Sequence, residues 1–152
     1  MTLPASLYLE DIHPGQRFVS GTHRIDAAQI KAFAAQYDPQ PFHLDEAAAA
    51  DSLFGGLAAS GWHTAALTMR LLTLSLPLSG GLIGAGVELQ WPQPTRPGAI
   101  LHVHSEVLTV RASKSRPSRG IVTMRCETRN QHDETLQRAI MTMIAFRRPP
   151  AA

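Results

Sequence analysis

Residues 60–77 read SGWHTAALTMRLLTLSLP, a run with the signals of one long apolar helix around which the rest of the chain can pack. Ser60 has the short hydroxyl side chain that favours a helix N-cap, and Pro77 cannot continue a helix. The apolar residues between them leave no polar face on the helix; they are Ala65, Ala66, Leu67, Met69, Leu71, Leu72, Leu74 and Leu76. The sequence therefore predicts one helix over residues 60–76 that lies buried inside the protein.

Strands are predicted around this helix. Apolar and polar residues alternate in three later segments, as in strands with one buried face; the segments are VELQW (87–91), LHVH (101–104) and VTMRCE (122–127). Residues 135–146 predict a fourth strand, and residues 17–25 predict an earlier one. One early strand, an apolar helix and four strands joined by turns indicate an α+β protein whose sheet wraps around a single buried helix.

A second helix is signalled upstream, from residue 26 to about residue 37. Asp26 and Gln29 have the spacing of a capping box. We expect the following segment DPQP (38–41) to form a rigid extended loop, because each proline lacks an N–H and restricts the residue before it. Asp45 can then cap a short helix through the alanine run, which the next glycine pair ends.

Length and composition narrow the class of protein. With 152 residues, 44% of them hydrophobic, the chain is long enough to form one domain over residues 1–152. Only 17% of the residues are charged, against about 25% in typical soluble domains, so we expect another copy of the chain to cover part of the surface. The formal charge of +2, without a dense basic tract, gives no indication of nucleic acid binding.

Cysteine content and hydropathy indicate where in the cell the protein is located. Cys126 is the single cysteine, so the chain has no intramolecular disulfide framework, and its strand pattern makes it a core residue. No basic leader precedes an apolar run near the N-terminus, and the longest apolar stretch is interrupted by Arg70 and Pro77. We therefore expect a cytoplasmic protein that does not associate with a membrane.

The sharpest chemical feature is an aspartate and a histidine on the proline-rich loop, Asp38 and His43. On a stiff loop the two can share a water molecule, with one group accepting its proton while the other orients it or delivers a proton elsewhere. The structural alternative is that Asp38 ends the preceding helix and His43 packs under the loop.

A glycine at the first turn of the apolar helix adds a third candidate. The N–H groups at a helix start have no partner within the helix, and Gly61 lets a carbonyl group approach closely, as an oxyanion hole requires. The alternative is an ordinary cap at Ser60 that happens to be followed by a glycine.

Three motifs in order resemble one known family; they are YDPQPFHLD (37–45), LAASGWHTAAL (57–67) and ELQWPQPTRPGAIL (88–101). Over about residues 10–147 the chain resembles the MaoC-like dehydratases, which include the (R)-specific enoyl-CoA hydratases. The resemblance implies a hotdog fold, in which an antiparallel sheet wraps around a long central helix, and a homodimer or higher homo-oligomer. It also implies a cofactor-free hydro-lyase that adds water to, or removes it from, an enoyl or 3-hydroxyacyl thioester of CoA or acyl carrier protein.

The resemblance assigns roles by position. Asp38 and His43 match the family's catalytic pair, and Gly61 matches its oxyanion donor. Departures from the usual residues include Tyr37 for glycine, Gln40 for asparagine, Ser60 for histidine, Met69 for a small polar residue and Ala99 for aspartate. These departures leave the acyl group of the substrate open. The residues expected to bind the substrate are Tyr37, Gln40, Phe42, Ser60 and Trp62.

Two other functions of hotdog proteins stay open. Thioesterases of this fold commonly place a carboxylate on the central helix, but here no Asp or Glu occurs between Asp51 and Glu88. The other alternative is a protein that binds acyl thioesters or a partner subunit without catalysis.

Two further groups of residues attract attention. His102 and His104 lie on one face of a predicted strand and could chelate a metal ion, yet no third ligand has a recognisable spacing, so we expect a solvated face and no metal. The segment RASKSRPSRG (111–120) carries four basic residues and no acid. It is expected to be a solvated hairpin, or otherwise a site for a phosphate of CoA or for an acidic carrier protein.

Overall fold

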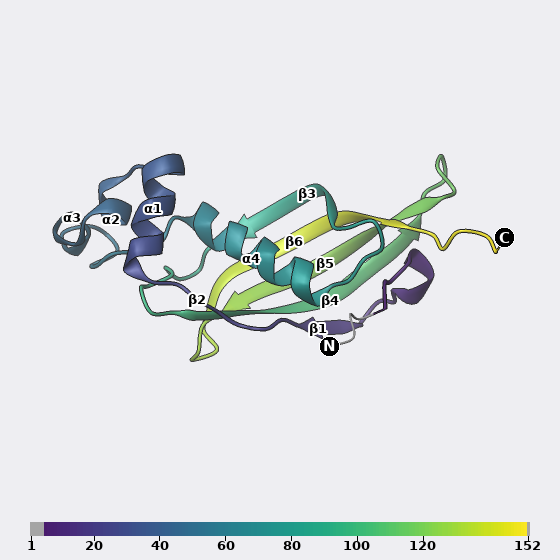
Figure 1. Cartoon of the computed structure of the whole chain (residues 1–152), viewed down its shortest axis with the longest axis horizontal. Helices are drawn as coiled ribbons and strands as arrows, with labels where there is room; N and C mark the ends of the chain where they lie inside the picture. The colour runs from purple at the N-terminus through teal and green to yellow at the C-terminus, as the bar shows by residue number, and fades with distance from the viewer. Residues whose placement is uncertain (1–4, 152) are drawn as a thin grey trace.

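The protein is described by a computed structural model that covers residues 5–151. In this range an antiparallel sheet curves around a long helix that crosses one of its faces (Figure 1). The strands are β1 Arg17–Val19, β2 His23–Arg24, β3 Ile83–Gln90, β4 Ile100–Ala112, β5 Arg119–Arg129 and β6 Thr135–Phe146. The helices are η1 Leu9–Asp11, α1 Ala27–Tyr37, α2 Pro41–Leu44, α3 Glu46–Ala50 and α4 Gly61–Ser75. The predicted α+β class is confirmed.

The sheet has the order β1-β4-β5-β6-β3, and β2 also pairs with β4. All of these pairings are antiparallel. In the three long central strands, buried and half-buried residues alternate, as the sequence predicted. Cys126 is fully buried among the core residues, which confirms its assignment.

Helix α4 has the predicted position but only part of the predicted burial. Ser60 is its N-cap and accepts a hydrogen bond from the N–H of Trp62 at 3.2 Å. One side of the helix packs on the sheet, because a helix on one sheet can bury only one face; its buried residues are His63, Thr64, Thr68, Leu71 and Leu72. Trp62 and Leu74 are 60% and 70% exposed. The prediction of a wholly buried helix is therefore wrong for a single chain.

The predicted early strand over residues 17–25 divides into β1 and β2. The break falls at Ser20. Its N–H donates to the carbonyl of Val103, and its Oγ accepts from the N–H of Val103 at 2.8 Å. Because the side chain replaces a backbone acceptor there, the regular ladder with β4 is interrupted.

Helices α1 to α3 gather at the end of the sheet where α4 begins (Figure 1). The predicted capping box is confirmed, since Asp26 accepts from the N–H of Gln29 at 2.8 Å and Gln29 accepts from that of Asp26 at 3.1 Å. Asp45 caps α3 by accepting from the N–H of Ala48 at 3.1 Å, but α3 ends at Ala50, well before the glycine pair. No helix in residues 5–151 is long and apolar enough to cross a membrane.

Candidate active site

The segment between α1 and α2 places the aspartate and the histidine side by side. Asp38 ends α1 by donating its backbone N–H to the carbonyl of Ala34 at 2.9 Å, so its carboxylate is available for contacts outside the helix. The extended loop predicted over residues 38–41 ends one residue early, because Pro41 begins α2. Proline suits the first helical position, where no N–H is needed. The short helix then turns His43 back toward Asp38.

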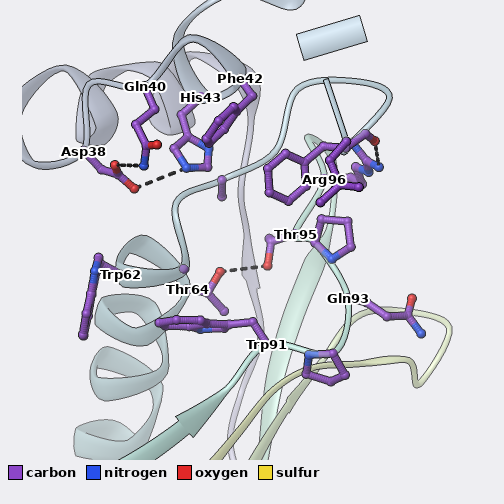
Figure 2. A pocket seen from close by; sticks show the side chains of 16 residues that line it. Asp38, Gln40, Phe42, His43, Trp62, Thr64, Trp91, Gln93, Thr95 and Arg96 are labelled. Atoms are coloured by element: carbon purple, nitrogen blue, oxygen red, sulfur yellow. Dashed lines mark hydrogen bonds and ion pairs between the residues drawn. The ribbon is translucent and has the colours of Figure 1, made fainter. Parts of the chain in front are cut away.

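The two side chains form a close pair at one wall of a pocket (Figure 2). Nε2 of His43 lies 3.2 Å from Oδ2 of Asp38. Nδ1 of His43 lies 2.5 Å from the carbonyl oxygen of Ala58. A carbonyl can only accept, so Nδ1 carries a hydrogen, and Nε2 is the ring nitrogen that faces Asp38. With only 4% of His43 exposed, this orientation is fixed by packing.

The surroundings of Asp38 keep its carboxyl ionised. Burial raises the pKa of this carboxyl, but hydrogen bonds from Ser60 and Gln40, together with the charge of His43, outweigh burial and lower the pKa below its usual value. Nε2 of Gln40 donates to Oδ1 of Asp38 at 2.5 Å. Oδ2 is therefore the carboxylate oxygen that faces the histidine.

Gly61 lines the same pocket at the N-terminus of α4. The Ser60 hydroxyl caps the N–H of Trp62, whereas the Gly61 N–H has no acceptor within its helix. A Cβ on Gly61 would lie 2.7 Å from Cε2 of Trp91, because the Trp91 indole packs against the helix start (Figure 2). Glycine is thus required at this position by a protein neighbour.

A buried polar chain holds that indole in place. Nε1 of Trp91 donates to Oε1 of Gln137 at 2.9 Å, and Nε2 of Gln137 donates to Oγ1 of Thr68 at 3.2 Å. The Thr68 hydroxyl also bonds the hydroxyl of Thr128 at 2.5 Å. These contacts connect β6 and α4 to the residue that covers Gly61, so they set the shape of the pocket beside the helix start.

The pocket has a volume of about 670 Å³. Six of the residues predicted for the site line it, and they are Asp38, Gln40, Phe42, His43, Gly61 and Trp62. Phe42 packs edge-on to the ring of His43, with the ring centroids 4.6 Å apart. The other two residues lie outside the lining. Tyr37 is 69% exposed and its ring packs at a tilt of 51° against that of Phe33, and Ser60 is fully buried beneath Asp38.

One wall of the pocket was not assigned by sequence reasoning. It comes from the segment WPQPTR (91–96), which the third motif contained without a role for any residue. Arg96 donates to the carbonyls of Phe54, Gly56 and Leu57 and so ties this wall to the loop after α3. Thr95 hydrogen-bonds Thr64 on α4 at 2.8 Å. Prolines on both sides of Gln93 were the available signal for a rigid wall.

The basic segment of residues 111–120 forms the exposed hairpin between β4 and β5. It lies at the end of the sheet opposite to α1, α2 and α3 (Figure 1). Within one chain, its charges are therefore remote from the Asp38 pocket.

This chain is similar to known proteins in both sequence and fold. A model of the MaoC like domain matches residues 12–130. The crystal structure of a MaoC-like dehydratase from Rhodospirillum rubrum is 62% identical, covers 95% of this chain and 100% of its own, and superposes with a TM-score of 0.94. The R-hydratase PhaJ1 of Pseudomonas aeruginosa is 26% identical, with coverages of 97% and 96% and a TM-score of 0.74.

A curated relative is a mesaconyl-CoA hydratase of Haloarcula hispanica. It is 29% identical over 92% of this chain, and the chain spans 36% of that enzyme's length. The family match takes in all three motifs and most of the chain, and the sheet around α4 is the hotdog fold of these neighbours. This protein therefore belongs to the MaoC-like dehydratase family.

Proposed function

We propose that this protein is a hydro-lyase that adds water to an enoyl thioester or removes it from a 3-hydroxyacyl thioester. The observation that carries the proposal is the 3.2 Å contact between His43 and Asp38 at the wall of a pocket that also contains the helix start at Gly61. A base and an oxyanion donor facing one cavity are the two elements that this reaction needs.

In the hydration direction, Asp38 and the Nε2 atom of His43 bind one water molecule and take a proton from it. The water oxygen forms a bond to Cβ of the enoyl group, and the π electrons move toward Cα and the thioester carbonyl. The proton taken by the pair is then delivered to Cα, so that atoms and electrons balance without a redox partner. Dehydration follows the same steps in reverse.

The negative charge that develops on the thioester oxygen needs a donor. Gly61 lines the pocket and its N–H has no acceptor within α4, so this N–H binds the oxygen in our proposal. The positive end of the helix dipole supports the same charge. Phe42, Trp62 and Trp91 provide apolar surface for the acyl chain.

The names of two relatives support the class of reaction. An R-hydratase shares this fold at 26% identity, and a mesaconyl-CoA hydratase is 29% identical over most of this chain. The proposal does not specify the acyl group of the substrate. Gln40 and the segment 91–96 line the pocket that would hold this group, and the proton transfer by Asp38 and His43 does not depend on their shape.

We also propose that a second copy of the chain covers the exposed side of α4 and the edge strand β3. Large apolar side chains are exposed on both elements, and they are Trp62, Met69, Leu74, Ile83 and Val87; the exposed Trp91 follows directly after β3. Strand β3 ends the sheet and has one unpaired edge. Because Trp62 and Trp91 also line the pocket, the second copy would close it.

Hydration of crotonyl-CoA tests the proposed reaction. We expect the absorbance of the enoyl thioester to fall with wild-type protein and to persist with Asp38→Asn. Asp51→Asn is the matched control, because Asp51 is exposed; this variant should retain wild-type activity. Binding of the thioester without turnover would identify a non-catalytic protein, and release of free CoA thiol would identify a thioesterase; either result would overturn the proposal.

A further inference from the structure

The outer face of β4 carries two histidines that the proposed reaction does not use. Leu101 and Val103 point toward α4 and are fully buried, so His102 and His104 point to the opposite face of the sheet. Their ring centroids lie 5.0 Å apart. Neither residue lines the Asp38 pocket.

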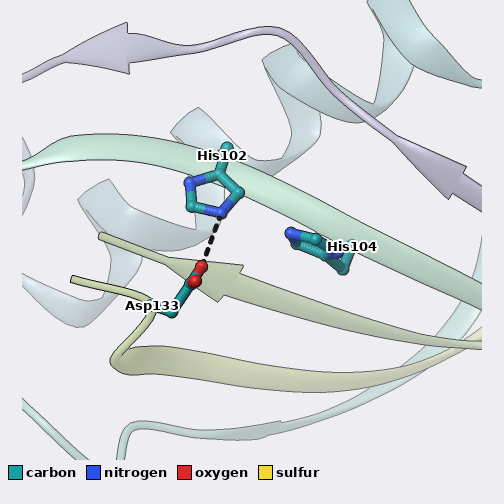
Figure 3. A group of neighbouring side chains, drawn as sticks. All are labelled: His102, His104 and Asp133. Carbon is teal, nitrogen blue, oxygen red and sulfur yellow. Dashed lines mark ion pairs between the residues drawn. The ribbon is translucent and has the colours of Figure 1, made fainter. Parts of the chain in front are cut away.

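A carboxylate from a distant part of the sequence reaches the same place (Figure 3). His102 pairs with Arg129 in the register of β4 and β5, so the turn that follows β5 lies beside it. Asn130 shapes this turn by accepting from the N–H groups of His132 and Glu134 at 2.9 and 3.1 Å. As a result, Oδ1 of Asp133 lies 3.3 Å from Nε2 of His102.

The three side chains together offer two imidazole nitrogens and one carboxylate oxygen within 4.8 Å of one another. Ligand atoms about 2.0–2.2 Å from one tetrahedral ion are separated by about 3.3–3.6 Å. The contact between His102 and Asp133 already has this spacing. The His104 ring must approach by about 1 Å, which a side-chain rotation of a half-exposed imidazole can supply.

The charged side chains around the cluster are compatible with a bound cation. Arg129 is a competing positive charge that acts on His104, and Glu127 offsets part of it with an oxygen 3.5 Å from its Nη2, although Glu127 also lies 3.6 Å from Nη2 of Arg138. Glu127 pairs with His104 in the strand register and so also lies close to the cluster. Asp133 is 74% exposed, which keeps one side of the cluster open to water.

We propose that His102, His104 and Asp133 form a binding site for a divalent transition metal ion such as Zn²⁺. Imidazole nitrogens favour zinc, cobalt and nickel over magnesium and calcium, which prefer all-oxygen sites. The ion would join β4 to the turn between β5 and β6 on the face of the sheet opposite α4. Because this site is separate from the Asp38 pocket, the proposal is independent of the proposed reaction.

Zinc titration of the full-length protein tests the site. The chain is stripped with a chelator, exchanged into chelator-free buffer and titrated with ZnCl₂ in a calorimeter, alongside His102→Gln, His104→Gln and Asp133→Asn. His132→Gln is the matched control, because His132 belongs to the same turn but lies outside the cluster. Circular dichroism in the presence of chelator confirms that each variant is folded.

We expect the wild-type protein and His132→Gln to bind one Zn²⁺ per chain, and each of the three variants to bind it at least about tenfold more weakly. Zinc should also raise the melting temperature of the wild-type protein and lose this effect in the three variants, because the ion binds only the folded arrangement. With Co²⁺ as the probe, tetrahedral ligand-field absorption should appear under the same conditions.

Two results would overturn the proposal. If the wild-type protein takes up no zinc, the cluster is an ion pair of His102 and Asp133 and nothing more. If zinc binding survives all three substitutions, the ion binds elsewhere in the chain.

Discussion

The indole of Trp91 occupies the space that a side chain on Gly61 would need. A Cβ at position 61 would lie 2.7 to 2.9 Å from three atoms of the indole ring. The Trp91 ring is held by its hydrogen bond to the buried side chain of Gln137 and cannot shift freely. The requirement for glycine at the start of α4 therefore comes from packing as well as from the approach of a substrate.

Replacement of Gly61 by alanine tests this relationship. We expect Gly61→Ala to lower the free energy of unfolding by about 1–3 kcal/mol, because the added methyl group overpacks the site. Activity should also fall, since the displaced Trp91 lines the pocket. Urea unfolding and crotonyl-CoA hydration measure the two effects. Gly21→Ala is the control, because a Cβ there meets no atom within 4 Å; equal losses in both variants would contradict the packing argument.

Removal of either member of the proposed catalytic pair should lower kcat and leave substrate binding intact. Asp38→Asn and His43→Gln should each lower kcat by about 10²-fold or more, since general acid–base assistance is worth about 10² to 10⁴. The double variant should lose much less than the product of the two losses, because both groups serve one water and one proton path. Steady-state kinetics measure this, with exposed His13→Gln as a control. Strictly multiplicative losses would show that the two groups act independently.

Ser60→Ala separates a capping role from an electrostatic one. Loss of the cap should cost about 1 kcal/mol of stability. The Ser60 hydroxyl also helps to lower the pKa of Asp38, although burial opposes it, so its removal should raise that pKa toward the usual value. The acidic limb of the kcat profile should then move to higher pH. A profile that coincides with the wild type would restrict Ser60 to capping.

His63 should make the fold sensitive to mild acid. Burial and then the charge of His23 lower the pKa of His63, and Nδ1 of His63 has no hydrogen-bond partner among the described residues. Below the pKa of the unfolded state, about 6.5, the unfolded chain binds a proton that the folded chain does not. Stability is therefore full above this pH and falls below it, by at most about 1.4 kcal/mol per pH unit from this group.

Urea unfolding between pH 8 and 5.5 checks this dependence. His63→Phe keeps the stack on Phe33, whose ring centroid lies 4.5 Å from that of His63, and should flatten the dependence on pH. His132 is exposed, so His132→Gln should leave the dependence of stability on pH unchanged. An unchanged pH dependence in His63→Phe would assign acid sensitivity to other groups.

Self-association should depend on the apolar surface of α4 and β3. We expect a dimer or larger assembly in sedimentation at micromolar concentration, and a shift to monomer in Leu74→Glu and Val87→Glu, which place charges on that surface. Val19→Glu is the control, since Val19 is 61% exposed on β1, at the opposite edge of the sheet. A wild-type monomer at this concentration would contradict the proposed interface.

Features that depend on neighbours along the chain could be predicted from the amino-acid sequence. The capping box at Asp26 and the caps at Asp45 and Ser60 are contacts between residues two or three positions apart, and all three form. The strands after α4 follow from a period of two residues. The approach of His43 to Asp38 is also local, because both lie within one short segment bent by Pro41.

Only the tertiary structure decided which distant residues meet. The side of α4 that is buried, the chain from Trp91 through Gln137 to Thr68, and the contact of Asp133 with His102 all depend on strand pairing. A shift of one residue in the register of a strand turns each of its side chains to the other face, and no local pattern specifies that register across long loops. The contact between Asp38 and His43 could therefore be predicted from sequence, whereas the wall over Gly61 and the carboxylate of Asp133 beside the two histidines could not.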